Sequence, residues 1–168
     1  MNFSENAAKR FNLVRGEYGE HAEKELKELL EHSFSNGYKV LTTRDWLKSK
    51  NIEWTSDLDA EFGDIQLIRE SDGKLIHFDS KRSHEDGFYG CVSYTNSYPG
   101  HLENTKEKFR EKDNAYYATF TPDCKSCRII KANKLKGLVP DNGEYWKTNE
   151  VQPFTESYDP LSFEFGGY

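Results

Sequence analysis

Apolar side chains recur at helical spacing in the most regular segment of the chain, residues 18–32. They fall on one face of a helical wheel, while Glu and Lys occupy most of the other positions. The members of that face are Tyr18, Ala22, Leu26, Leu29 and Leu30. The pattern predicts an amphipathic helix with one buried face. Residues 4–14 have similar spacing behind Ser4, a good N-cap residue, and predict a shorter helix.

Short runs of β-branched and aromatic residues, separated by turn residues, follow that helix. The runs predict strands over residues 38–42, 65–68, 75–78, 115–120 and 128–131. Turn residues predict turns at 35–37, 71–73 and 121–123, a polar loop or helical turn near 45–50, and a loop over 87–100. A charged helix is expected over 102–113. This order of elements favours an α/β (α+β) fold with a mixed central β-sheet flanked by helices.

Length and composition favour one domain over residues 1–168, with 152–168 as an aromatic and acidic C-terminal tail. The 11 Phe, 10 Tyr and 3 Trp residues can supply much of the buried area that a hydrophobic fraction of 35% leaves short. No apolar stretch approaches the roughly 20 residues that cross a bilayer, and no secretory leader is visible. We therefore expect a cytoplasmic protein without a membrane partner.

The distribution of charge bears on nucleic-acid binding. A net charge of −6 counts against a protein that coats nucleic acid, because such proteins are usually basic. Residues 124–136, however, carry five basic residues and no acid. The basic residues are Lys125, Arg128, Lys131, Lys134 and Lys136. This strip could bind phosphates, with Lys125, Arg128, Lys131 and the separate Arg82 as candidates, or it could be a solvated edge whose lysines prevent aggregation.

Two acids and a lysine lie at the ends of the predicted 65–78 hairpin. Asp64 closes a Phe-Gly-Asp turn before the first strand, and Asp79 and Lys81 follow the second. A tight hairpin brings both carboxylates to one end of the ladder, and side-chain alternation puts Asp79 and Lys81 on one face. Carboxylates are the hard ligands that Mg²⁺ prefers, with the Ser80 carbonyl as an extra ligand. A neighbouring ammonium can orient the attacking water or stabilise developing negative charge.

The combination of Gly63-Asp64, two strands and Asp79-Ser80-Lys81 resembles the PD-(D/E)xK nuclease superfamily, nearest in motif to Holliday junction resolvases. That superfamily has an acid on its first helix, an acid at the start of a hairpin, and (D/E)xK on the second strand. Here Phe62-Gly63-Asp64 replaces the usual Pro-Asp element. The resemblance covers roughly residues 16–82 and implies a restriction endonuclease-like fold.

The predicted 18–32 helix carries two candidate acids for this pattern. Gly19 and the residues after it look like the Gly-x-x-x-Glu-x-x-Leu helix of the resolvase branch. On a wheel of 100° per residue, Glu23 lies about 75° from the centre of the buried face, and Glu20 about 135° away. Glu23 is therefore the preferred acid and Glu20 the second choice. The alternative for both is a solvated helix with i,i+4 pairs to Lys24 and Lys27.

The resemblance implies an endonuclease that uses Mg²⁺ or Mn²⁺ to hydrolyse phosphodiester bonds of DNA, including branched or structured DNA. Asp64 and Asp79 would bind the metal, with Ser80 and Glu23 as further ligands, and Lys81 would position or activate the nucleophile. Cutting both strands needs two active sites, which favours a homodimer. The alternative is a non-catalytic module of the same fold that binds or inhibits a protein or nucleic acid, and the overall acidity favours it.

Other candidate chemistry is weaker. Cys124 and Cys127 form a single CxxC, whereas a structural zinc needs two more ligands, so a turn between strands is the preferred interpretation. His77 shares a face with Asp79 and is expected to be structural. The aromatic residues of the 87–100 loop could stack on unpaired bases or simply cover the core.

Overall fold

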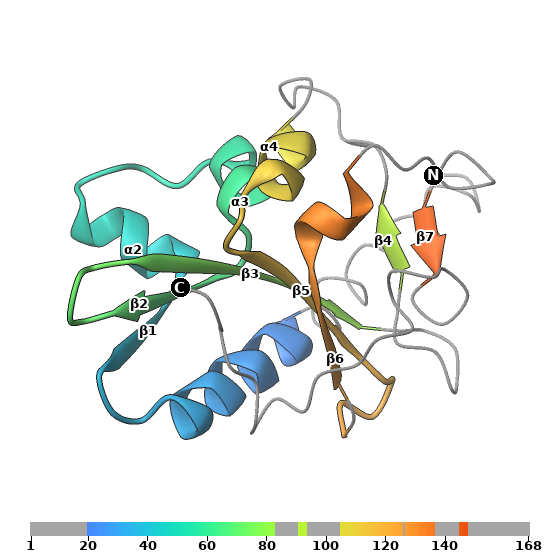
Figure 1. Cartoon of the computed structure of the whole chain (residues 1–168), viewed down its shortest axis with the longest axis horizontal. Coiled ribbons are helices and arrows are strands. Elements are labelled where there is room, and N and C mark those ends of the chain that lie inside the picture. The colour runs from blue at the N-terminus through green and yellow to red at the C-terminus, as the bar shows by residue number, and fades with distance from the viewer. Residues whose placement is uncertain (1–19, 83–90, 94–104, 126, 137–144, 148–168) are drawn as a thin grey trace, which may run out of the picture.

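The fold is built on a five-stranded mixed sheet (Figure 1), seen in a computed structural model that describes residues 20–82, 91–93, 105–125, 127–136 and 145–147. The strands are β1 (Tyr38–Thr42), β2 (Ile65–Arg69), β3 (Leu75–Arg82), β5 (Ala115–Phe120) and β6 (Cys127–Lys131). Their order in the sheet is β1-β2-β3-β5-β6. Only the β3–β5 pair is parallel within this sheet. The predicted α/β (α+β) class with a mixed sheet is confirmed.

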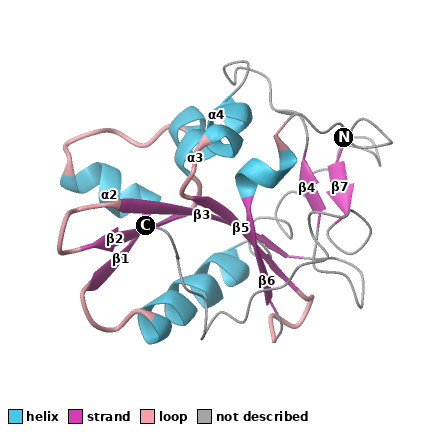
Figure 2. Ribbon diagram, in the orientation of Figure 1, coloured by secondary structure: helices cyan, strands magenta, loops and turns pink. Residues whose placement is uncertain are grey.

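Helices cover both faces of this sheet (Figure 2). Residues 20–33 form a long helix, blue in Figure 1, on one face. The opposite face carries α2 (Thr43–Ser49), α3 (Ser56–Phe62), α4 (Thr105–Glu111) and the 3-10 helix η1 (Ala132–Leu135). Among the described helices, none has the length and apolar character that crossing a bilayer requires.

Side-chain alternation along β3 separates two environments. Ile76 and Phe78 point into the core beneath the 20–33 helix, where they pack with Ala22, Leu26 and Leu30. His77, Asp79 and Lys81 alternate with them and therefore belong to the face that carries α3 and α4. A second apolar cluster between the sheet and α4 is formed by Phe109, Ala115, Tyr117, Ile130, Ala132 and Leu135.

Most predicted elements are present, and the differences concern segments without an apolar period. α3 was not predicted: it contains no fully buried residue, and its start depends on the Thr55 side chain, which accepts from the Leu58 amide. β3 continues to Arg82, four residues beyond its predicted end. The predicted 87–100 loop is wrong at β4 (Cys91–Ser93), which pairs antiparallel with β7 (Tyr145–Lys147). The predicted 4–14 helix and the 152–168 tail lie outside the described residues.

Candidate active site: an acid cluster at the open edge of β3

The end of the β2–β3 ladder creates the site. That ladder stops at the Ile65–Phe78 pair, whereas β3 continues to Arg82 with β5 as its partner. Asp64 lies at this fork. Its amide donates to the Phe78 carbonyl (2.7 Å), and its Oδ2 accepts from the Ser80 amide (2.8 Å) and the Ser80 hydroxyl (2.9 Å). The Asp64 carboxylate thus accepts the β3 amide that has no β2 partner. This amide belongs to Ser80, the neighbour of Asp79.

Asp79 and Lys81 form an ion pair on the other side of this strand. Asp79 Oδ2 lies 2.7 Å from Lys81 Nζ, and the two side chains are 17% and 33% exposed. Their contact confirms the predicted common face. Burial lowers the pKa of Lys81, but the Asp79 and Asp64 carboxylates outweigh this effect and raise the pKa overall. The ammonium therefore stays charged at neutral pH.

A glycine allows the chain to reach Asp64 from α3. Gly63 ends α3 with φ of +78°, in the left-handed region, and its amide donates to the Asp59 carbonyl. A Cβ at this position would lie 2.5 Å from the Phe78 carbonyl oxygen. Both the backbone conformation and the close approach therefore require glycine. This requirement explains why a glycine precedes Asp64.

Buried hydrogen bonds fix the same turn from the α2 side. The Thr43 amide donates to the Asp64 carbonyl (2.8 Å), and the Thr43 hydroxyl donates to the Gly63 carbonyl (2.6 Å). Gln66 Nε2 donates to the Phe62 carbonyl (2.8 Å) and to Thr43 Oγ1 (2.9 Å). The Phe62 and Gly63 carbonyls, directly before Asp64, are therefore held by side chains that are themselves buried.

His77 completes this network. Its Nδ1 lies 2.5 Å from Gln66 Oε1. Burial, followed by the nearby Lys112 charge, lowers the pKa of His77 to about 4. A neutral ring that donates to an amide oxygen agrees with the structural role expected for His77.

Glu23 approaches the cluster from the 20–33 helix. Its side chain is half-buried, whereas Glu20 is exposed, as the helical wheel predicts. Burial raises the pKa of Glu23 to about 7, with further contributions from the charges of Asp59 and Asp79. The ion pairs along this helix join His21 to Glu25 and Lys27 to Glu31, and Glu23 forms none with a described residue.

Sequence reasoning missed a fourth acid, Asp59 on α3. Burial raises its pKa to about 6, and the Asp79 charge adds to the rise. Asp64 also has a pKa well above the usual range, first through burial and then through Asp79 and Asp59. The only sequence signal for Asp59 is its position four residues before Gly63, which is one helical turn. That signal requires a helix that periodicity did not indicate.

The cluster therefore holds Glu23, Asp59, Asp64 and Asp79 close to Lys81, with an excess of negative charge. Crowded carboxylates are stabilised either by protons or by a cation. In the described ranges, no three Asp, Glu, His or Cys side chains form a group ready to hold a metal ion. Asp79 is turned towards Lys81, and Asp64 towards Ser80. Both contacts use the Oδ2 oxygen of the carboxylate.

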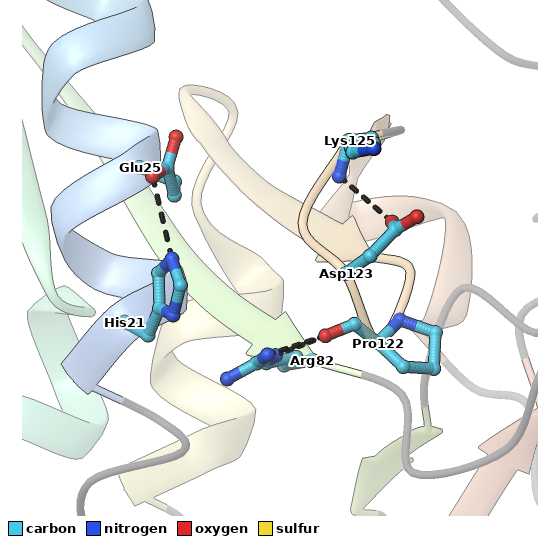
Figure 3. A network of polar contacts seen from close by, with 6 residues as sticks. All are labelled: His21, Glu25, Arg82, Pro122, Asp123 and Lys125. Atoms are coloured by element: carbon cyan, nitrogen blue, oxygen red, sulfur yellow. Dashed lines mark hydrogen bonds and ion pairs between the residues drawn. The ribbon is translucent and has the colours of Figure 1, made fainter.

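The predicted nucleic-acid-binding residues whose side chains are described lie near the β5–β6 turn and on β6. Arg82 lies at the end of β3, but its guanidinium donates to the Pro122 carbonyl at the β5–β6 turn (Nε, 2.8 Å; Figure 3). Lys125 is exposed in that turn, and Lys131 is half-buried on β6. β6 is an edge strand, separated from β3 by β5. The Arg128 side chain lies outside the described part of the chain.

The two cysteines of the CxxC, predicted to form a turn between strands, lie in the turn after β5 and at the start of β6. Cys124 has φ of +59°, and Cys127 begins β6. Both are thiols rather than a disulfide. Burial raises the pKa of Cys124 and raises that of Cys127 to about 12. Protonated thiols are poor metal ligands and poor nucleophiles.

Comparisons with family models, with curated proteins and with solved structures find no match to this chain. We therefore infer function from the site alone.

Proposed function

We propose that this protein is a Mg²⁺-dependent nuclease of the PD-(D/E)xK type, with a restriction endonuclease-like fold, that hydrolyses phosphodiester bonds of DNA. One observation carries the proposal: the Asp64 carboxylate is hydrogen-bonded to the Asp79-Ser80-Lys81 segment, beside the Asp79–Lys81 pair. Glu23 approaches from the first described helix. The superfamily resemblance implies the same arrangement: an acid on a helix, an acid before a hairpin, and Asp-x-Lys on the second strand of that hairpin.

The donor set suits a hard divalent cation. The candidate ligands are the carboxylates of Asp64, Asp79 and Glu23 and the Ser80 carbonyl, all of them oxygen donors. Burial is the main cause of the raised pKa values of Asp64 and Glu23, and the neighbouring carboxylates add a repulsion that a cation would relieve. When bound, Mg²⁺ or Mn²⁺ would lower the pKa of a water molecule and neutralise phosphate charge.

Lys81 supplies the permanent positive charge in the site. Its ammonium can orient a water molecule and can also stabilise an oxygen that gains negative charge in the transition state. Removing one such donor typically costs 10²–10³-fold in rate. Glu23 has a pKa of about 7. In its charged form it can bind the metal ion or accept a hydrogen bond from a water molecule.

The test is plasmid nicking with Mg²⁺ or Mn²⁺ by the wild type and by Asp79→Ala and Lys81→Ala variants. We expect each variant to lose about 10²-fold or more. Asp72→Ala is the matched control, because Asp72 pairs with Arg69 in the β2–β3 turn, away from the cluster. Equal cutting by Asp79→Ala would show that the assigned site is wrong. A wild type that cuts neither duplex, single-stranded nor branched DNA with any metal would overturn the proposal.

A second candidate is a non-catalytic module of the same class that binds DNA or another protein. The observation that favours it is the separation of the basic β6 edge from the acid cluster, together with a net charge of −6. Binding of DNA without any cleavage would support this alternative. A homodimer, which duplex cleavage would favour, is tested by sedimentation of the purified protein.

A further inference from the structure

An exposed arginine lies close to the acid cluster. Arg44 is the second residue of α2, directly after Thr43, whose amide donates to the Asp64 carbonyl (2.8 Å). Arg44 therefore directly follows a residue whose main chain is hydrogen-bonded to the main chain of Asp64. Its side chain is exposed, and its positive charge lowers the pKa of both Glu23 and Asp59. Arg44 therefore lies between the cluster and solvent.

The Arg44 side chain is held in place by a tryptophan. Its Cζ lies 4.5 Å from the centroid of the Trp54 ring, a cation–π contact. Trp54 is half-buried, and its Nε1 donates to Asp59 Oδ1 at 3.3 Å. Asp59 thus anchors Trp54, and Trp54 supports the guanidinium. Stacking engages the face of the guanidinium, so its in-plane N–H groups remain available to a second partner.

The chemistry of these N–H groups identifies that partner. A planar guanidinium fork matches the oxygens of a phosphate, and an arginine that is already ordered loses less side-chain entropy when it binds. Arg44 forms no ion pair with a described carboxylate. Lys81, by contrast, pairs with Asp79, and Arg82 with the Pro122 carbonyl.

We propose that Arg44, supported by Trp54, binds a backbone phosphate of the nucleic acid next to the phosphate that is cut. The inference rests on the proposed nuclease function and adds a substrate-binding residue to it. An acidic site repels a polyanion, so the substrate needs a cation close to the cluster. Arg44 supplies this cation from the α2–α3 segment, and the binding site is therefore formed on this side of the sheet rather than at the β6 edge.

The same helix provides a matched control. Lys50, the C-cap of α2, lies over the Trp46 ring at 5.6 Å from its centroid. It is also an exposed cation stacked on a tryptophan, but six residues along a helix separate it from Arg44 by about 9 Å. Lys50 is not among the charges that shift Glu23, Asp59 or Asp64. Lys50→Ala should therefore leave DNA binding and cleavage unchanged.

The experiment measures binding of a fluorescein-labelled DNA duplex with a single-stranded flap by anisotropy, in Ca²⁺ to suppress cleavage, at several salt concentrations. We expect Arg44→Ala to weaken binding about 10-fold and to reduce the salt slope by about 0.9, which corresponds to one lost phosphate contact. Arg44→Lys should retain most of the slope but lose affinity, because it keeps the charge and loses the fork. Trp54→Ala should weaken binding with Arg44 still present.

The outcomes separate this inference from the proposed function. If the wild type cuts DNA while Arg44→Ala matches its affinity and salt slope, the Arg44 inference is wrong and the nuclease proposal stands. Equal losses in Arg44→Ala and Lys50→Ala would show a general charge effect and would also overturn the inference. If the wild type neither binds nor cuts any DNA, both proposals fail together. A cooperative thermal unfolding transition establishes that each variant is folded. If the alanine variant is unfolded, Arg44→Lys still tests whether the planar guanidinium is needed for binding.

Discussion

Two unrelated requirements meet at Gly63, and they fix where Asp64 lies. The left-handed backbone is costly for any residue with a Cβ, and the nearby Phe78 carbonyl leaves no space for one. Gly37 and Gly73 also have positive φ, but nothing lies within 4 Å of a Cβ built on either. A substitution at Gly37 or Gly73 therefore carries only the cost of the positive φ, whereas one at Gly63 also carries the cost of a steric clash.

Gly63→Ala is predicted to be the most damaging of these three alanine substitutions. It should lower the free energy of unfolding by roughly 3 kcal/mol or more, whereas Gly73→Ala should cost about 1–2 kcal/mol. Urea denaturation measures both. Because the clash also displaces Asp64, Gly63→Ala should lose nicking activity that Gly73→Ala retains. Similar losses in the two variants would contradict the close approach to Phe78.

Asp59→Asn tests the mutual repulsion within the cluster. The Asp59 charge is the largest electrostatic contribution to the raised pKa of Glu23, after burial itself. Removing that charge should lower the Glu23 pKa below its value of about 7. Carboxyl NMR titration of the two proteins gives this difference. Asp57→Asn, on the same helix, should leave the pKa unchanged, and a shift of equal size in it would contradict the assignment.

How far the sequence predicts the site depends on the residue. Glu23 could be distinguished from Glu20 because helical periodicity determines which one approaches the core. Alternation along one strand likewise predicted that Asp79 and Lys81 share a face, on which the structure pairs them. Asp59 and Arg44 could not be found in this way, because their positions depend on tertiary hydrogen bonds through Thr43 and Trp54.

At the scale of elements, the Thr43–Gln66–His77 network connects α2, β2 and β3 beneath the site. Gln66 uses its amide nitrogen and oxygen for three contacts while fully buried. Buried polar groups that lose their partners carry the full cost of desolvation. The network is therefore sensitive to any change that removes one member and leaves the others.

Gln66→Leu should lower the free energy of unfolding by about 2–4 kcal/mol, because His77 Nδ1 and the Phe62 carbonyl lose their partner. In the double variant Gln66→Leu/His77→Leu, part of this loss should be recovered, since both polar partners are then replaced. A thermodynamic cycle of the two single variants and the double variant measures the coupling. Strict additivity would show that the Gln66–His77 contact contributes no coupling.

The predictability of the elements follows their burial pattern. β1, β2 and β5 were predicted from apolar runs, and the 20–33 helix from its stripe. α3 has acidic side chains and no buried residue, so no period marks it. β3 extends past its apolar run because β5 pairs with the polar residues 79–82, and that pairing is not local in the sequence.

For the whole molecule, the excess negative charge makes stability depend on pH and on divalent cations. Glu23 has a pKa of about 7 in the folded protein and 4.5 as its ordinary value. Between these values the folded state binds more protons than the unfolded state, so this group lowers stability as pH rises. His77, with a pKa lowered to about 4, acts in the opposite sense below pH 6.5. Because the two groups act in opposite directions, the contribution of Glu23 to the pH dependence of stability has to be measured by comparing variants.

Glu23→Gln should be more stable than the wild type at pH 8, by on the order of 2 kcal/mol, and the difference should vanish near pH 4. Thermal and urea unfolding at pH 4, 6, 7 and 8 in EDTA measures this. Adding Mg²⁺ at pH 8 should stabilise the wild type more than Glu23→Gln, because the cation replaces the missing protons. A difference that is constant with pH would contradict the raised pKa.

The partnering of residues 79–82 with β5 has a consequence for synthesis of the chain. A nascent chain that ends at Arg82 already contains all four acids and Lys81, and the β2–β3 hairpin is local enough to form. It lacks residues 115–120, the strand against which Asp79 and Lys81 are aligned. Parallel pairing across this separation forms late, because a long loop must close first. The site can therefore be assembled only after the ribosome has passed Phe120, which would delay the proposed cutting activity until most of the described fold has been made.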